Sequence, residues 1–204
     1  MFFGATFTKA VGKHAHGLFS LLAVALLSSC GPAVYTPAAD IEAHGHVIAN
    51  VPFIRQPESL CGPAALAGVM QFWGRPASVE EIAKAVYLPQ LKGTLPMDME
   101  RYAKGQGFRV ATPAGTLDAI RAAVKDNRPV ICLIDLGFSI VQQPHYVTVI
   151  GFDDWQGILI MHDGVTPNRT MTYAAFEKTW KRAGTWMMVM EPETAKEKEN
   201  LSHN

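Results

Sequence analysis

The chain has 204 residues, of which 49% are hydrophobic and 18% are charged, so it can hold one globular domain with flanking segments. Its 18 basic residues equal its 18 acidic residues, and this balance argues against electrostatic capture of nucleic acid or a polybasic membrane patch. We therefore expect no nucleic-acid partner.

The N-terminal residues are predicted to be an export signal and not part of the fold. Two lysines precede the apolar run 17–27, GLFSLLAVALL, which is too short to span a bilayer comfortably and is typical of a signal-peptide core. The run leads into LSSCG at 27–31, which resembles a bacterial lipobox and implies that cleavage leaves Cys30 as a lipidated N-terminus. The alternative is an ordinary secretory signal with an incidental cysteine. Gly31 resembles the residue found after the cysteine in lipoproteins sent to the outer membrane. We therefore expect residues 1–29 to be a lipoprotein signal peptide and the protein to lie in the cell envelope, on the periplasmic face of the outer membrane.

Two segments are predicted to flank the domain. Residues 30–50 contain prolines and alanines and are expected to be an irregular tether. Their pair His44 and His46 lacks neighbouring cysteines or a carboxylate cluster, so an exposed linker is favoured over a metal site. Residues 191–204 are charged and polar and are expected to be a disordered tail. The domain is therefore predicted at residues 51–190.

The domain is expected to open with a short strand at residues 51–54, which delivers Gln56, followed by a buried helix that starts at Cys61. Pro63 suits a first helical turn, where its missing N–H is not needed, and an apolar run follows on nearly all sides until Gly74 ends the helix. A thiol at a helix N-terminus lies near the positive end of the helix dipole, which favours the thiolate. Cys61 is therefore a candidate nucleophile. The alternative is an inert packed cysteine, which is what most buried free cysteines are.

Four further elements are predicted before the main part of the sheet. They are a helix at 78–86 with a capping box, a helix at 94–105, a strand at 108–111 and a helix at 116–127 that Thr116 caps.

The C-terminal half is predicted to supply most of the sheet. Strands are expected at 129–136, 145–152, 157–162 and 186–190, with a rim loop at 137–144 and an amphipathic helix at 172–182. Cys132 lies in the first of these strands, an apolar run, and is expected to be packing. A Cys61–Cys132 disulfide, which an exported compartment permits, is the alternative. Helices gathered early and antiparallel strands gathered late favour an α+β fold.

Three distant residues are candidate partners of Cys61. His145 begins one strand of a predicted hairpin and Asp163 follows the end of the next, so antiparallel pairing places both at one sheet edge. A cysteine with a distant histidine and acid is the pattern of a thiol hydrolase. We assign Cys61 as nucleophile, His145 as proton carrier and Asp163 as the group that fixes the histidine tautomer. The Gln56 side-chain amide and the Cys61 N–H would bind the oxyanion. His162 is expected on the opposite face of the strand as a structural residue. The non-catalytic alternative is that His145 merely binds a backbone carbonyl.

The CGPAALA block after Gln56, the strand HYVTVIGFD and the terminal Asp163 resemble the C39-like cysteine peptidases. These form a papain-like fold group that includes the bacteriocin-processing, double-glycine peptidases. The resemblance covers about residues 51–190, which is most of the mature chain, and implies a papain-like fold, with an N-terminal nucleophile helix packed on a C-terminal antiparallel sheet. The family usually has a proline soon after the aspartate, whereas this chain has Gly164. Alternatives for the orienting group therefore stay open: Asp153, Asp154 and Asn168.

The resemblance implies a cysteine peptidase that hydrolyses peptide bonds in exported polypeptides, with double-glycine leaders as one candidate substrate. The sequence has no transmembrane bundle and no GxxxxGK[ST] loop, so we do not expect it to be the transporter itself. An amidase or isopeptidase acting on another acyl bond is one alternative. A catalytically silent module that binds a peptide or a partner subunit is another. No metal or organic cofactor is expected.

Overall fold

The structure, a computed structural model, describes residues 41–194. The predicted signal peptide, Cys30 and residues 195–204 of the predicted tail lie outside the described residues. Among the helices of residues 41–194, none is both long and apolar enough to cross a membrane.

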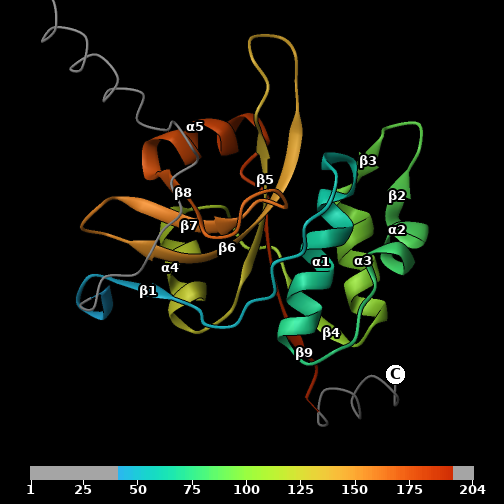
Figure 1. The fold of residues 1–204 in the computed structure, drawn as a ribbon, viewed down its shortest axis with the longest axis horizontal. Helices are drawn as coiled ribbons and strands as arrows, with labels where there is room; N and C mark the ends of the chain where they lie inside the picture. Colours follow the sequence, from blue (N-terminus) through green and yellow to red (C-terminus); the bar gives the residue numbers. More distant parts are fainter. Residues whose placement is uncertain (1–40, 195–204) are drawn as a thin grey trace, which may run out of the picture. The chain divides into compact units, whose positions relative to one another are not determined.

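One antiparallel sheet of seven strands organises the described residues (Figure 1). Its order is β4 (Phe108–Ala111), β9 (Met187–Pro192), β5 (Val130–Asp135), β6 (Pro144–Asp153), β7 (Ile158–His162) and β8 (Arg169–Thr172), while β1 (Gly45–Val47) pairs with the end of β6 at Gly151–Asp153. Two shorter strands, β2 (Tyr87–Leu88) and β3 (Gly93–Thr94), form a separate hairpin.

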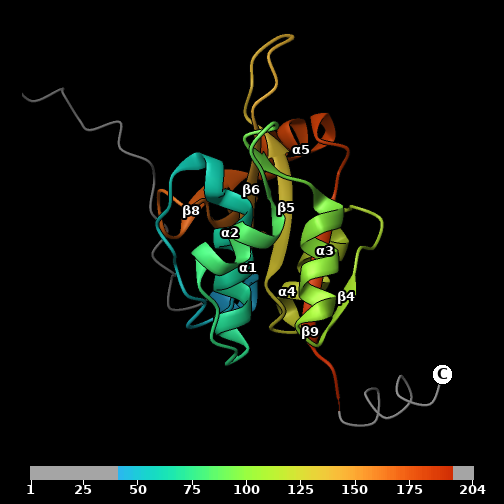
Figure 2. The same cartoon turned by 90° about the vertical axis from the view of Figure 1, so that its right-hand side faces the viewer.

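Helices cover both faces of the sheet (Figure 2). The chain forms α1 (Cys61–Phe72), α2 (Val79–Val86), α3 (Pro96–Gly105), α4 (Leu117–Lys125) and α5 (Tyr173–Arg182), with single 3-10 turns at Ile41–Ala43 and Glu58–Leu60. The first three helices share one apolar cluster with Ile131 of β5, and the other two share a second cluster with Cys132. Neighbouring residues of a strand point to opposite faces, so β5 contributes to both clusters and reads as a continuous apolar run.

Three helices begin with a side-chain cap, of which those at Ser78 and Thr116 were predicted and that at Thr172 was not. The hydroxyl of Ser78 accepts the Glu81 N–H, that of Thr116 accepts the Ala119 N–H, and that of Thr172 accepts the Ala175 N–H. Each bond satisfies one of the N–H groups that a helix leaves unpaired at its start.

The entry to the domain differs from the prediction. Residues 51–54 are not a strand, and Pro52 among them cannot donate to a sheet ladder. Instead β1, which we placed in the tether 30–50, pairs with β6. Gly45 permits this pairing, because a Cβ there would collide with the carbonyl oxygen of Phe152. At the other end, β9 continues to Pro192, so the predicted tail begins too early.

Candidate active site

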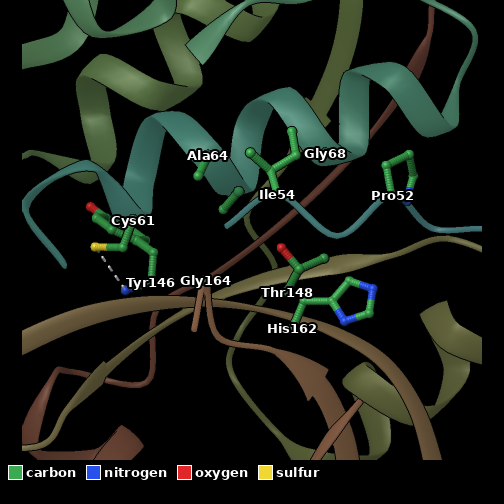
Figure 3. A pocket seen from close by; sticks show the side chains of 10 residues that line it. Pro52, Ile54, Cys61, Ala64, Gly68, Tyr146, Thr148, His162 and Gly164 are labelled. Atoms are coloured by element: carbon green, nitrogen blue, oxygen red, sulfur yellow. Dashed lines mark hydrogen bonds between the residues drawn. The ribbon is translucent and has the colours of Figure 1, made fainter. Parts of the chain in front are cut away.

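Cys61 is the first residue of α1, and its side chain is half-buried. No side chain caps the start of this helix; Leu60 occupies the N-cap position. The Tyr146 N–H points at the Cys61 Sγ over 3.5 Å, so the sulfur lies beside the peptide unit that joins His145 to Tyr146 (Figure 3). Beyond the thiol, every residue from Gly62 to Met70 is buried, which confirms the predicted buried helix.

His145 is the second residue of β6, and its side chain is only 6% exposed. Its Nε2 lies 2.8 Å from the main-chain carbonyl oxygen of Asp163. A carbonyl oxygen can only accept a hydrogen bond, so Nε2 carries the proton and Nδ1 of the neutral ring keeps its lone pair. The fold therefore selects one tautomer of His145, with Nδ1 as the nitrogen able to take up a proton.

Asp163 directly follows β7, and its carboxylate is engaged within its own turn. The carboxylate accepts the main-chain N–H groups of Val165 and Thr166 and a bond of 2.8 Å from Nη1 of Arg169. Burial acts to raise the pKa of Asp163, but the bonds from Thr166, Arg169 and Val165 outweigh it and hold the pKa below its ordinary value. We predicted that this carboxylate would contact the His145 ring; the contact is made by the main-chain oxygen of the same residue.

Gln56 is joined to the same turn through its main chain. Its N–H donates over 3.0 Å to the carbonyl oxygen of Gly164, and the chain then reaches Cys61 through the 3-10 turn. Gly164 has a φ of +78°, a conformation that glycine adopts without strain. The four predicted site residues are thus linked by short contacts: Gln56 to the Asp163 turn, that turn to His145, and the next residue of β6 to Cys61.

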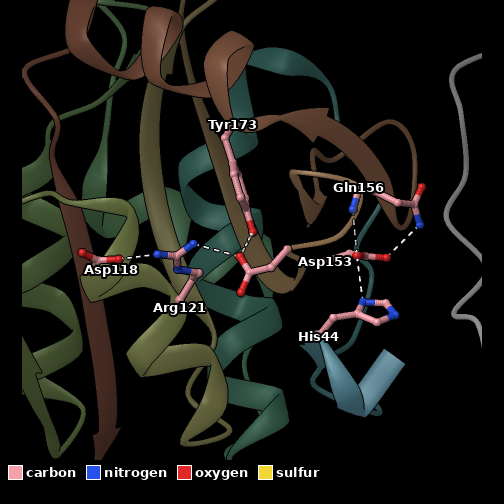
Figure 4. A network of polar contacts seen from close by, with 7 residues as sticks. His44, Asp118, Arg121, Asp153, Gln156 and Tyr173 are labelled. Atoms are coloured by element: carbon pink, nitrogen blue, oxygen red, sulfur yellow. Dashed lines mark hydrogen bonds and ion pairs between the residues drawn. The ribbon is translucent and has the colours of Figure 1, made fainter. Parts of the chain in front are cut away.

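The alternative acids lie elsewhere. Asp153 is at the opposite end of β6 from His145, a separation of about 26 Å along an extended strand. Its buried carboxylate meets Nδ1 of His44 at 3.0 Å and accepts from Gln156 (Figure 4). Asp154 accepts hydrogen bonds from Arg121 of α4 and from the hydroxyl of Tyr173. These contacts anchor the start of β1 and the β6–β7 turn.

His162, predicted to be structural, is bonded at both ring nitrogens. Its Nε2 faces the carbonyl oxygen of Val51 at 3.1 Å, and its Nδ1 lies 3.3 Å from the main-chain nitrogen of Asn168. Asn168 was the third alternative to Asp163 as the group that orients His145, and its main-chain N–H donates to His162 instead. The N–H donor requires Nδ1 to be an acceptor, so the ring is held neutral with its proton on Nε2. Burial lowers the pKa of His162, although the bond to Val51 and the charge of Asp163 partly oppose that effect.

We expect His162 to make the protein less stable in mild acid. Its pKa is depressed in the folded state, so the unfolded state binds more protons once the pH falls below about 6.5. The stability that His162 contributes is therefore complete above that pH and is lost as the pH falls through the folded pKa, at no more than about 1.4 kcal/mol per pH unit. Urea unfolding of the wild type and of His162→Gln at pH 7.5 and 5.5 measures this. A decline that is equally steep in both proteins contradicts the assignment.

Two cavities flank the Cys61 thiol. The smaller, about 20 Å³, lies between α1 and the ends of β6 and β7 (Figure 3). It is lined by Pro52, Ile54, Cys61, Ala64, Ala65, Gly68, Tyr146, Thr148, His162 and Gly164. The larger, about 310 Å³, opens toward the β2–β3 hairpin. It is lined by Cys61, Leu91, Lys92, Gly93, Thr94, Leu95, Pro96, Leu133, Pro144 and Tyr146. A substrate that reaches the sulfur therefore meets a narrow space on one side and a roomier, largely apolar one on the other.

The second cysteine of the domain is packing, as predicted. Cys132 is fully buried in β5, and burial raises the pKa of its thiol well above the usual range. Neither Cys61 nor Cys132 is part of a disulfide, so the Cys61–Cys132 bridge considered above is not formed. Within residues 41–194, no group of histidine, cysteine and acidic side chains could hold a metal ion.

Comparison with known proteins points to a peptidase family. A sequence model of the Peptidase_C39 like family matches residues 48–188. No curated protein matches the chain.

Solved structures share the fold. A structure described as that of a C39-like peptidase from Bacillus anthracis has a TM-score of 0.63 and 17% identity, covering 74% of this chain and 98% of that one. A double glycine motif protease from an AMS/PCAT transporter, in complex with the leader peptide, has a TM-score of 0.57 and 18% identity, covering 72% and 95%. Xylellain, a cysteine protease from Xylella fastidiosa, has a TM-score of 0.57 and 11% identity, covering 80% and 92%. These likenesses confirm the predicted α+β, papain-like fold.

Proposed function

The chain belongs to the Peptidase_C39 like family, and on that premise we propose that it is a cysteine peptidase whose nucleophile is Cys61. The observation that carries the proposal is the 3.5 Å contact between the Cys61 sulfur and the N–H of Tyr146, because it brings the only half-buried thiol of the described residues to the residue after His145. An inert packed cysteine has no need of this neighbour.

The reaction would proceed through a thioester. The proton of the Cys61 thiol passes to Nδ1 of His145, and the thiolate attacks the carbonyl carbon of the substrate. As the peptide C–N bond breaks, the imidazolium returns the proton to the departing amine. Water then attacks the thioester, His145 takes a proton from that water, and the thiol is regenerated as the acid product leaves.

Oxyanion stabilisation would come from the start of α1 and the segment before it. The Cys61 N–H belongs to the first turn of α1 and points out of the start of this helix, beside the thiol, so we assign it as the first oxyanion donor. Gln56 is fixed through its main chain to Gly164 and is half-buried, which suits a side-chain amide that acts as the second donor.

The substrate class we propose is an exported polypeptide. The double glycine motif protease, which shares the fold, is a peptidase in complex with a leader peptide. In this chain, the narrow cavity beside Cys61 would admit only a small group, and the larger cavity presents Leu91, Leu95 and Leu133 to an apolar one. Incubation of the full chain with a peptide library, followed by mass spectrometry of the products, tests both points. Cleavage with no preference for a small residue at the scissile bond removes the specificity argument, and no cleavage of any peptide removes the peptidase assignment.

We also propose that Cys30 is lipidated and holds the domain at the periplasmic face of the outer membrane, as its LSSCG context suggests. Growth of a producing cell with an alkyne fatty acid is expected to label the wild-type chain and not Cys30→Ser. Equal labelling of the two proteins contradicts the assignment.

The second candidate function is a binding module that keeps the fold and captures a peptide without cutting it. The reactivity of the thiol separates the two. A thiolate paired with an imidazolium reacts with iodoacetamide at pH 6, whereas an ordinary thiol hardly reacts there. Slow alkylation of Cys61 at pH 6, at the rate of a model thiol, favours the binding module. The Cys61 thiol of an amidase or isopeptidase would be alkylated as fast as that of a peptidase. These enzymes would be distinguished by the products of the bond that they hydrolyse.

A further inference from the structure

We propose that Arg169 is a positioning residue for His145, acting by holding the Asp163 turn so that a main-chain carbonyl, and not a carboxylate, orients the imidazole. The inference rests on the proposed function, since the orientation of His145 matters to chemistry only if this ring carries the proton. Arg169 does not belong to any motif that marks it in the sequence as a site residue.

The Asp163 carboxylate is already committed to other donors. One of its oxygens accepts the N–H groups of Val165 and Thr166, and the other accepts Nη1 of Arg169 at 2.8 Å. These are charge-assisted bonds, which are stronger than neutral ones. They fold the segment after β7 back on itself and turn the carboxylate into that segment. The atom of Asp163 that meets Nε2 of His145 is the main-chain oxygen, at 2.8 Å.

Arg169 closes this turn from the neighbouring strand. It is the first residue of β8 and pairs with Met161 of β7, so it stands across from the strand that leads to Asp163. The Asp163 side chain is only 4% exposed, whereas the Arg169 side chain is 35% exposed. The two main-chain N–H donors would remain, but a carboxylate this deeply buried is costly without a counter-ion, so loss of the guanidinium should make it take up a proton or turn toward solvent. Either change moves the carbonyl that His145 contacts.

The arrangement also couples the two sides of the site. The carbonyl oxygen of Gly164, the next residue of the turn, accepts the Gln56 N–H at 3.0 Å. Arg169 therefore supports both the acceptor for the His145 ring and the anchor of the segment that carries Gln56. A shift of the turn by a fraction of an ångström would misplace the proton carrier and the oxyanion donor together.

A main-chain acceptor makes a specific prediction for two substitutions. In Asp163→Asn the side-chain oxygen can still accept the turn N–H groups, and the main-chain carbonyl is unchanged, so His145 should keep its tautomer. In Arg169→Gln the charge that holds the carboxylate is gone, so the turn should loosen. If the carboxylate touched the ring directly, the severity of the two substitutions would be reversed.

The experiment uses the full chain, with nitrogen NMR of its histidine rings and the rate of Cys61 alkylation by iodoacetamide at pH 6. In the wild type we expect His145 to be a single tautomer protonated at Nε2. Arg169→Gln should give a mixture of tautomers and about a tenfold slower alkylation. Arg169→Lys, which keeps a cation on β8, should restore most of the rate, and Asp163→Asn should keep the single Nε2-protonated tautomer of His145. Arg121→Gln, which breaks a comparable arginine–aspartate contact on α4, is the matched control and should change neither reading.

Two results would overturn the inference. One is an unchanged tautomer and rate in Arg169→Gln. The other is a mixture of His145 tautomers in Asp163→Asn, which would show that the carboxylate orients the ring. If Arg169→Gln does not fold, the tautomer of His145 in Asp163→Asn still decides between the main-chain and the carboxylate acceptor. None of these readings requires peptide hydrolysis, so a failure of the peptidase assignment is recognised separately, by the absence of cleavage products in the wild type.

Discussion

Cys61→Ala is expected to abolish peptide hydrolysis, with kcat reduced by at least about 10⁴-fold, because no other described side chain near the site can form the thioester. Cys61 is half-buried at the first position of α1 and supplies no side-chain cap, so its removal should leave the fold intact. Hydrolysis of the best library peptide, followed by chromatography and normalised to folded protein by circular dichroism, measures the loss.

The matched control is the other cysteine of the domain. Cys132 is fully buried in β5, so Cys132→Ala should cost about 1 kcal/mol of unfolding free energy and leave hydrolysis and alkylation unchanged. Cys61→Ser keeps the shape of the site but has a much weaker nucleophile. Full activity in Cys61→Ser or Cys61→Ala would rule out Cys61 as the nucleophile.

His145→Gln is expected to reduce kcat by about 10³-fold or more. Glutamine can still donate to the carbonyl oxygen of Asp163, as Nε2 of His145 does, but it cannot accept the thiol proton or return it to the amine. The thiol of Cys61 should also lose its reactivity at pH 6. Single-turnover hydrolysis and iodoacetamide alkylation measure the two effects.

His162→Gln separates a catalytic histidine from a structural one. Both rings are bonded to a main-chain carbonyl, and His162 also borders the small cavity beside Cys61. Because both nitrogens of His162 are bonded, we expect its replacement to lower stability and to leave alkylation of Cys61 within about threefold of the wild type. An equal loss of alkylation in the two variants would remove the special role assigned to His145.

Much of the fold could be predicted because its signals are local. The apolar run after Cys61, the Ser78 and Thr116 caps and the strand that begins near His145 each lie within a short window, and each element formed there. Short-range propensity and capping are settled by neighbouring residues. The position of His145 and Asp163 at one sheet edge could also be predicted. In an antiparallel hairpin the start of the first strand lies beside the end of the second strand.

The misplaced elements have non-local causes. The strand β1 has three residues and no apolar alternation, and it exists only because the end of β6 extends beyond β5 and offers a free edge. Helices α4 and α5 cover the face of the sheet opposite α1, and the sequence of neither helix predicts which face it covers. These features depend on which surfaces remain uncovered after the larger elements have packed.

The sequence by itself determined which residues could do chemistry, since a thiol, an imidazole and an amide have fixed properties wherever they stand. It also determined that Cys61 begins a helix and that His145 and Asp163 share a sheet edge. Only the tertiary structure decided which oxygen of Asp163 faces the ring, that Arg169 holds the carboxylate, and that Asp153 serves β1 instead. Such choices are made by competition among donors within a few ångströms, and those donors come from segments that only folding brings together.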